Sequence, residues 1–361
     1  MKLLLAGGGT GGHLFPAVAL AQGLLQRNKA DTVQFVGTEQ GLEARLLPKL
    51  GLPLAMVDMS GFVGRGLLGK VQSLLKLLRS LGQARQILRH FQPDLVIGVG
   101  GYASVPVLLA AKLGGIPYLI HEQNAVPGLS NRLLARWAER VCLSVSGSDQ
   151  YFDRSRTLLT GNPVRQELEA VAAELPDKAK LLIFGGSRGA RAINRCVLEA
   201  LPLLTKKIDH LKILHQSGEE DLEEVRRGYR DAGLDPDQVV SFIDDMAVAY
   251  EEASLVICRA GATTIAELTV CGRPAILIPY PYAAGDHQTA NALALGEVGA
   301  ACLLPQTEMT AQRLAQLVEE LISDRKRLSK MAASSRKLGR PGATELILSE
   351  CERLLSRQKG N

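Results

Sequence analysis

The 361-residue sequence has few cysteines and no long hydrophobic segment. Its six cysteines are scattered without a C-x-x-C pair, which argues against a disulfide framework or a thiolate zinc site and favours a reducing, cytoplasmic setting. The apolar stretch at the start is too short for a signal peptide, and no later run approaches the roughly 18 apolar residues of a spanning helix. We therefore expect neither a secretory leader nor a membrane span.

Acidic residues are scarce in the first half of the chain. Residues 1–165 carry 18 Lys/Arg against 9 Asp/Glu, whereas residues 166–361 carry 24 against 28, so the halves have net charges of +9 and −4. Such an asymmetry indicates that the first half meets something anionic.

Glycine is plentiful, and 36 glycines against 7 Phe, 7 Tyr and 1 Trp favour an α/β protein with many tight turns. Short apolar runs alternate with amphipathic stretches, which is typical of repeated βαβ units. This alternation of strand-like and helix-like segments is interrupted near residues 159–165 and then resumes. We predict two facing, Rossmann-like, doubly wound α/β domains (1–163 and 164–340) with a ligand-binding cleft between them. Residues 341–361 are expected to form a helix that packs back on the first domain.

The segment GGGTGG at residues 7–12 satisfies the G-x-G-x-x-G fingerprint of dinucleotide-binding proteins. That fingerprint also needs an acidic residue near the end of the second strand, and neither Asp31 nor Glu39 is well placed there. A nicotinamide cofactor is therefore disfavoured. Bare amides in this turn would suit a phosphate or sugar oxygen. His13 beside them is a candidate general base, or a structural histidine.

Three clusters in the second half follow predicted strands. In GGSRGAR, Ser187 and the helix start would stabilise a diphosphate, unless the glycines serve only a tight turn. In CRAGATTIAEL, Glu267 either accepts hydrogen bonds from two ribose hydroxyls or forms a capping box with Thr264. In PYPYAAGDHQTAN, Gln288 and Asn291 are neutral side chains suited to forming hydrogen bonds with sugar hydroxyls. Asp286 in the same segment is explained equally well as the N-cap of the helix that follows.

The segment IHEQN places Glu122 after a strand of the first domain, where it could pair with His13 as an acid, base or orienting group. Metal ligation is poorly supported because no H-E-x-x-H occurs and the D-x-D in GLDPDQ is typical of a helix cap.

No acidic residue occurs between Asp58 and Asp94, where cations and helically spaced leucines accumulate. This pattern indicates a membrane-surface element, or a core-packing helix with solvated charges. We favour the membrane for the loop and its cations, and we disfavour nucleic acid because no aromatic residues are interleaved. The residues expected at the membrane are Phe62, Val63, Leu67, Leu68, Lys70, Lys76 and Arg79.

Eight motifs in order, GGGTGGH, GGYAS, HEQN, GNPVR, GGSRGA, FIDDM, RAGATTIAE and DHQTANA, resemble the MurG family of bacterial GlcNAc transferases. That family makes the second lipid-linked precursor of peptidoglycan. Two positions depart from the usual form of the motifs: Arg188 stands where glutamine is frequent, and Gly285 stands where a second aspartate often precedes DHQ.

The resemblance implies a GT-B fold whose first domain takes undecaprenyl-diphosphate-linked MurNAc-pentapeptide and whose second domain takes UDP-GlcNAc. It implies inverting transfer to the acceptor 4-hydroxyl, with His13 and Glu122 facing the acceptor. Ile243 would contact uracil through its backbone, and Glu267 would hold the ribose. The expected donor-binding residues are Thr10, Gly11, Gly12, Asn124, Arg165, Ser187, Ile243, Ala262, Thr263, Thr264, Ile265, Ala266, Glu267, Gln288 and Asn291.

The same resemblance implies a peripheral protein at the cytoplasmic face of the bacterial cell membrane. No tightly bound cofactor is expected, and any stimulation by Mg²⁺ would need no protein ligands. Two alternatives stay open: a related transferase that uses another lipid acceptor such as diacylglycerol, and a non-catalytic, membrane-bound subunit that binds a nucleotide sugar.

Overall fold

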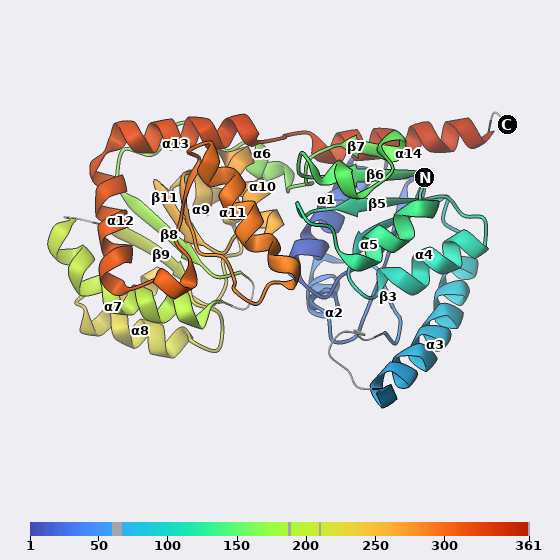
Figure 1. Cartoon of the computed structure of the whole chain (residues 1–361), viewed down its shortest axis with the longest axis horizontal. Helices are drawn as coiled ribbons and strands as arrows, with labels where there is room; N and C mark the ends of the chain where they lie inside the picture. Colours follow the sequence, from blue (N-terminus) through green and yellow to red (C-terminus); the bar gives the residue numbers. More distant parts are fainter. Residues whose placement is uncertain (60–66, 187–188, 209–210, 360–361) are drawn as a thin grey trace. The chain divides into compact units, whose positions relative to one another are not determined.

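The computed structural model describes residues 1–59, 67–186, 189–208 and 211–359. The chain divides into two compact units (Figure 1): unit 1 comprises Met1–Arg165 and Gly342–Asn361, and unit 2 comprises Gln166–Pro341. The division falls two residues after the expected boundary at 163, and the C-terminal segment belongs to unit 1.

Unit 1, over its described residues, contains a seven-stranded parallel sheet in the order β3-β2-β1-β4-β5-β6-β7. The strands are β1 (Lys2–Gly7), β2 (Thr32–Gly37), β3 (Leu54–Met56), β4 (Leu95–Gly100), β5 (Tyr118–Glu122), β6 (Arg140–Leu143) and β7 (Thr157–Leu159). β4 and β5 are buried along their whole length because helices cover both faces of the sheet.

Alternate residues of each strand point to opposite faces and so enter separate cores. Leu3 and Leu5 of β1 pack with α1 and α14, whereas Leu4 and Ala6 pack with α3, α4 and α5. The helices of unit 1 are α1 (Gly11–Arg27), α2 (Leu42–Leu46), α3 (Leu67–Phe91), α4 (Ser104–Leu113), α5 (Leu129–Leu134) and α14 (Ala343–Lys359), with 3-10 turns at Pro48–Leu50, Ala135–Trp137, Ser148–Tyr151 and Arg154–Arg156.

Helix α14 is held in unit 1 by apolar and charged contacts. Leu348 and Cys351 are fully buried in the core beneath α1. Arg27 at the end of α1 forms ion pairs with glutamates of α14, and Arg140 of β6 lies 2.7 Å from Glu350. The C-terminal helix therefore packs on the first unit.

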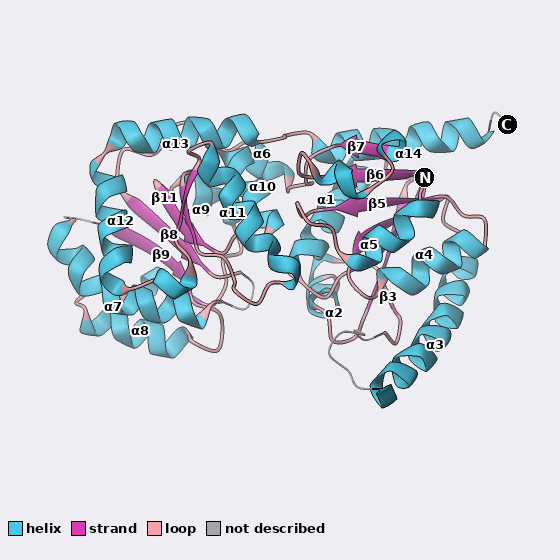
Figure 2. Ribbon diagram, in the orientation of Figure 1, coloured by secondary structure: helices cyan, strands magenta, loops and turns pink. Residues whose placement is uncertain are grey.

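Unit 2 has a six-stranded parallel sheet in the order β10-β9-β8-β11-β12-β13 across the described residues. Figure 2 shows β8, β9 and β11 of this sheet in magenta among the cyan helices. Its strands are β8 (Lys180–Phe184), β9 (Lys212–Gln216), β10 (Val239–Val240), β11 (Leu255–Cys258), β12 (Ala275–Leu277) and β13 (Ala301–Leu303). Its helices are α6 (Gln166–Glu169), α7 (Arg191–Lys207), α8 (Leu222–Asp231), α9 (Met246–Glu251), α10 (Ala262–Cys271), α11 (His287–Glu297), α12 (Ala311–Ser323) and α13 (Arg325–Leu338), with 3-10 turns at Pro236–Gln238, Ala284–Asp286 and Gln306–Glu308.

The predicted pair of doubly wound α/β folds is confirmed. The sequence pattern missed β7, because this edge strand is only three residues long and runs into the turn that had suggested a pause between domains.

Candidate functional site

Strand order reverses at one place in each sheet, and the glycine-rich motifs lie there. β1 neighbours β4 in unit 1, and β8 neighbours β11 in unit 2. Doubly wound sheets bind ligands outside the carboxyl ends of the strands at such a reversal. GGGTGGH follows β1 and GGYAS follows β4, while GGSRGA follows β8 and RAGATT follows β11. Each unit therefore carries a candidate ligand site on chain segments that topology brings together.

The two glycine motifs of unit 1 touch through their backbones. Gly101 has a φ of +80°, and a Cβ at this position would lie 2.6 Å from the carbonyl oxygen of Gly8. Only glycine permits so close an approach. The contact brings the turn before α1 against the turn after β4 and leaves His13 beside Gly100.

His13 is the third residue of α1, and its side chain is half-buried. Its Nδ1 atom lies 3.0 Å from Oε1 of Gln123, the residue that directly follows β5. The expected partner was Glu122, so that pairing is wrong. Side chains alternate along a strand, and Gln123 and Glu122 consequently face different ways.

Glu122 instead fixes the loop that follows β5. It is 1% exposed, and its oxygens accept hydrogen bonds from the amides of Asn124 (2.9 Å) and Gly128 (3.2 Å) and from Nδ2 of Asn131 (2.8 Å). The side chain of Asn124 also donates to Glu122 at 3.3 Å. A carboxylate with this many donors is well satisfied where it is, which argues against a role for Glu122 as a general base.

Glu43 is a buried carboxylate that sequence reasoning missed. It accepts hydrogen bonds from the amides of Gly9 (2.7 Å) and Thr38 (2.8 Å) and is 1% exposed. The expectation of bare amides in the first turn is thus wrong at Gly9. A negative charge there also disfavours a dinucleotide phosphate. The sequence feature that could have indicated this site is the set of glycines that surround Glu43. Cβ atoms at Gly8, Gly37 or Gly41 would lie within 2.5 Å of its side chain.

The remaining donor residues expected in unit 1 are found at the start of α1 and at the end of the unit. Thr10 is the N-cap residue of α1 but makes no capping hydrogen bond with its side chain, and Gly11 and Gly12 open the helix. Arg165 ends unit 1, and its guanidinium lies 5.9 Å from the ring centroid of Phe15 in α1. Such a geometry is typical of a cation–π contact.

In unit 2, the expected segment Ala262–Glu267 forms the first two turns of α10. The capping-box alternative is wrong, because the N-cap residue is Gly261 and Glu267 lies in the second turn. Glu267 is 8% exposed, and its Oε2 accepts a hydrogen bond from the Tyr250 hydroxyl at 3.0 Å. Burial raises the pKa of Tyr250 well above its usual value, so this hydroxyl keeps its proton and remains a donor.

Gln288 and Asn291 lie in the first turns of α11, and both have local partners. Nδ2 of Asn291 donates to the Ala260 carbonyl at 3.1 Å, which ties α11 to the loop before α10. Oε1 of Gln288 accepts from the amide of Tyr280 at 2.9 Å. Asp286 is the N-cap residue, and its carboxylate accepts from the Thr289 hydroxyl at 2.7 Å.

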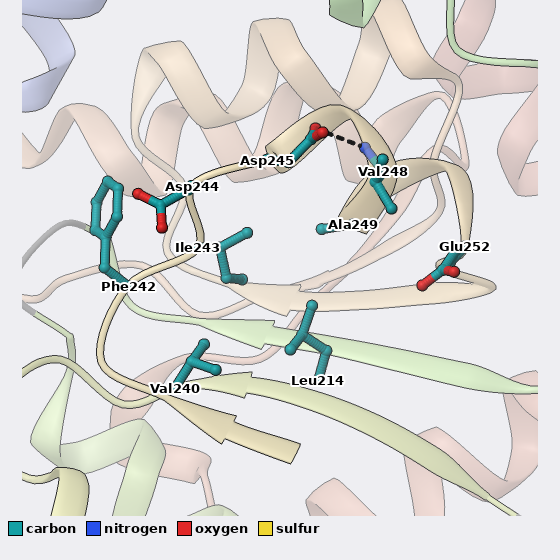
Figure 3. A pocket seen from close by; sticks show the side chains of 9 residues that line it. All are labelled: Leu214, Val240, Phe242, Ile243, Asp244, Asp245, Val248, Ala249 and Glu252. Atoms are coloured by element: carbon teal, nitrogen blue, oxygen red, sulfur yellow. Dashed lines mark hydrogen bonds between the residues drawn. The ribbon is translucent and has the colours of Figure 1, made fainter. Parts of the chain in front are cut away.

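Ile243 lines a pocket of about 330 Å³ in unit 2, which Figure 3 shows from close by. The floor is apolar, and Asp245 caps α9 by accepting from the amide of Val248 at 3.1 Å. This volume is at the lower end of the range of small-molecule pockets. The lining residues are Leu214, Val240, Phe242, Ile243, Asp244, Asp245, Val248, Ala249 and Glu252.

The second glycine-rich turn packs on the end of β9. A Cβ at Gly189 would lie 1.9 Å from the carbonyl oxygen of Ser217, and Gly189 has a φ of +75°. Behind it, Nε2 of buried His215 lies 3.1 Å from Oδ1 of Asn194, whose Nδ2 donates to the Ser217 carbonyl at 2.9 Å. Ser187 and the variant position Arg188 lie outside the described residues.

Two buried histidines make stability depend on pH. Burial lowers the pKa of His215 to about 3 and that of His121 to about 4, from a usual value near 6.5. Below pH 6.5 the unfolded chain binds protons that the folded chain does not, so stability falls as pH falls.

We expect each histidine to lower the free energy of unfolding by about 2 kcal/mol between pH 6.5 and 5. Urea unfolding of the wild type and of His215→Gln at pH 7, 6 and 5 checks this. In His215→Gln, the fall in the free energy of unfolding on acidification should come from His121 alone and be about half as large as in the wild type. Equal slopes for the two proteins would contradict the assignment to His215.

The expected membrane residues are only partly described. Phe62 and Val63 lie outside the described residues, and Leu67, Leu68 and Lys70 lie in the first turn of α3, of which only the backbone is described. Nζ of Lys76 lies 3.5 Å and Nη1 of Arg79 lies 3.9 Å from the carboxylate of Asp58. These two cations share one carboxylate, so the three side chains together keep a net charge of +1, and the expected contact with lipid stays a prediction.

An exposed apolar stripe on α5 and the turn after it was not foreseen. Leu129, Leu133 and Trp137 are 67%, 48% and 39% exposed and recur every fourth residue. The intervening Leu134 and Ala135 are buried, so the stripe is the outer side of a helical segment.

Two searches confined to the described part of the chain are negative. No helix there is long and apolar enough to cross a membrane. No group of three or more His, Cys, Asp or Glu side chains there could hold a metal ion.

Comparison with known proteins assigns both units to one family. Residues 3–143 match the glycosyltransferase family 28 N-terminal domain, and residues 180–347 match its C-terminal domain. A protein of Syntrophotalea carbinolica is 57% identical over 97% of this chain and 98% of its own, and one of Geotalea uraniireducens is 49% identical over 98% of each. Both are named UDP-N-acetylglucosamine--N-acetylmuramyl-(pentapeptide) pyrophosphoryl-undecaprenol N-acetylglucosamine transferase.

The crystal structure of Acinetobacter baumannii MurG agrees with the fold. It matches with a TM-score of 0.77 and 36% identity over 98% of this chain and 99% of that one. The match confirms the GT-B fold class that the motifs implied. The chain therefore belongs to glycosyltransferase family 28 and, within it, to the MurG family of N-acetylglucosamine transferases.

Proposed function

We propose that this chain transfers GlcNAc from UDP-GlcNAc to undecaprenyl-diphosphate-linked MurNAc-pentapeptide, the reaction for which its relatives are named. The observation that carries this proposal is identity of 57% over nearly the whole chain, which includes both units. The arrangement of His13 in unit 1 and Glu267 in unit 2, each beside a strand-order reversal, supports it.

In the proposed reaction, Nε2 of His13 takes the proton of the acceptor 4-hydroxyl as its oxygen attacks the anomeric carbon of GlcNAc. The bond from that carbon to the diphosphate breaks, and UDP leaves with the electron pair. The product has a β-1,4 bond because attack comes from the face opposite the leaving group. Glu122 supports this chemistry indirectly, by fixing the loop that carries Asn124.

Unit 2 supplies the donor contacts in this proposal. The amide end of α7 would stabilise the departing diphosphate, since a helix N-terminus carries a partial positive charge. Arg165, the last residue of unit 1, would add a cation. Glu267 would accept from the ribose hydroxyls, and the apolar pocket at Ile243 would receive the uracil ring. Protein donors then supply the charge stabilisation, and Mg²⁺ would act at most on the diphosphate itself.

UDP release tests the function directly. Purified full chain is given UDP-GlcNAc with and without a short-chain lipid-linked MurNAc-pentapeptide, alongside UDP-GalNAc and a diacylglycerol acceptor. Release that requires the muramoyl acceptor and GlcNAc together supports the proposal. Release with diacylglycerol alone would instead indicate a different lipid acceptor, and donor binding without any turnover would indicate a binding subunit.

For membrane association, we propose that the outer surface of α3, α4 and α5 meets the anionic cytoplasmic leaflet of the cell membrane. These helices share one core on one face of the sheet of unit 1. Leu113 at the end of α4 is also exposed, at 63%. Apolar side chains at the interface and nearby cations together favour peripheral binding.

We expect the double variant Leu129→Glu/Leu133→Glu to bind vesicles with anionic lipid at least about tenfold more weakly, because burying one leucine is worth about 1.5–3 kcal/mol. Cosedimentation measures the binding. Leu346→Glu on α14, also at an exposed leucine of unit 1, is the matched control and should bind normally. Lys76→Gln/Arg79→Gln should have a smaller effect, since both cations already face Asp58. Undiminished binding of the double leucine variant would count against this surface.

A further inference from the structure

Three side chains of unit 1 form a continuous chain of hydrogen bonds that starts at His13. Nδ1 of His13 lies 3.0 Å from Oε1 of Gln123. Nε2 of Gln123 in turn lies 3.0 Å from Nδ1 of His121. Gln123 is 1% exposed and His121 is fully buried, so water does not compete for these contacts.

The surroundings of Gln123 decide which end of its carboxamide faces His13. The amide nitrogen lies 3.0 Å from the Val99 carbonyl oxygen and 3.2 Å from that of His121. A carbonyl oxygen only accepts hydrogen bonds, so the NH₂ group must face these two atoms. The opposite orientation would bring oxygen against oxygen in a buried site. The carboxamide oxygen therefore faces His13.

This orientation has a consequence for the proton on His13. A carboxamide oxygen cannot donate, so Nδ1 of His13 must carry the hydrogen. In a neutral imidazole the other nitrogen, Nε2, then has a free lone pair. We propose that Gln123 is a positioning residue that holds neutral His13 in the Nδ1–H tautomer and so leaves Nε2 as the atom that accepts a proton. This inference rests on the proposed role of His13 as the base.

The far end of the chain is consistent with the same proton assignment. Burial lowers the pKa of His121 to about 4, so His121 is neutral at pH 7. Its Nδ1 accepts from Gln123, and its Nε2–H faces the Gly161 carbonyl at 3.3 Å and the Ser144 hydroxyl oxygen at 3.1 Å. These proton positions are compatible with one another along the whole chain of hydrogen bonds. Neutral histidine free in water favours the Nε2–H tautomer, so the protein must impose the opposite one.

Two variants of Gln123 separate its acceptor oxygen from its bulk. Gln123→Met keeps the size but removes the acceptor, and we expect kcat to fall about 10- to 100-fold while the Kd of UDP stays the same, because a wrong tautomer removes general-base catalysis. Gln123→Glu restores an acceptor: as the neutral acid, its carbonyl oxygen accepts from His13 while its hydroxyl donates to the Val99 carbonyl, and kcat should recover to within about fivefold of the wild type.

The nitrogen chemical shifts of His13 give the deciding measurement. The full chain, labelled with ¹⁵N-histidine, is recorded above pH 7.5, and the His13 signals are assigned by their loss in His13→Ala. The wild type should show protonated Nδ1 and bare Nε2, and Gln123→Met should show a mixture or the reverse. Ser144→Ala removes a hydroxyl beside His121 without touching Gln123, and it should keep the wild-type tautomer and kcat.

Three outcomes would overturn the inference: an Nε2–H tautomer in the wild type, unchanged His13 shifts in a Gln123→Met protein whose kcat has fallen, or wild-type kcat in Gln123→Met. The shifts are read without turnover. Failure of the proposed function would show separately, as absence of acceptor-dependent UDP release by the wild type.

Discussion

Replacement of His13 by alanine is expected to lower kcat about 100- to 10,000-fold, the range that a positioned general base contributes. The Kd of UDP should change little, because UDP is proposed to bind unit 2 and His13 belongs to α1 of unit 1. The acceptor hydroxyl would still approach the anomeric carbon but would keep its proton. Steady-state UDP release and calorimetric titration with UDP measure the two quantities.

His90→Ala is the matched control for that experiment. His90 lies in the last turn of α3 in the same unit and is exposed, so its loss should leave both quantities unchanged. Near-wild-type turnover of His13→Ala would remove His13 from the reaction. Loss of UDP binding together with kcat would indicate instead that the variant had disturbed the fold.

Strand positions could be read from the sequence because buried parallel strands leave a strong local pattern. LVIGVG and YLIHE are apolar runs bounded by turns, and they form β4 and β5. The order of the strands then places the glycine-rich turns at the reversals in both sheets. The pattern of apolar runs, each followed by a turn, therefore predicted the fold and the edge of each sheet at which ligands are expected to bind.

Pairings between side chains were much harder to predict, because they depend on distances between segments far apart in the chain. His13 and Gln123 are 110 residues apart, and one step along the chain separates Gln123 from Glu122, which was expected in its place. Glu43 was overlooked because its partner in the first glycine-rich turn, Gly9, lies 34 residues away. The capping box at Thr264 failed for a local reason: the helix begins at Ala262, which moves Glu267 into the second turn.

Glu267 is the residue of unit 2 whose loss should weaken donor binding most. Its carboxylate is nearly buried, and one oxygen already accepts from Tyr250. Two charge-assisted hydrogen bonds to the ribose would each contribute about 1.5–3 kcal/mol. We therefore expect Glu267→Ala to raise the KM for UDP-GlcNAc at least about 10-fold, since 1.4 kcal/mol corresponds to a factor of ten.

Part of that loss could come from the fold, because Glu267→Ala leaves the buried Tyr250 hydroxyl without its acceptor. Tyr250→Phe removes the same hydrogen bond and keeps the carboxylate, so it should lower stability but raise KM by no more than about threefold. Comparison of UDP with 2′-deoxy-UDP isolates the ribose contact. The wild type and Tyr250→Phe should both prefer UDP, whereas Glu267→Ala should bind the two nucleotides with similar affinity. If Glu267→Ala kept the full preference for UDP, the 2′-hydroxyl would have another partner, and the role of Glu267 would be to hold Tyr250 and α10 in place.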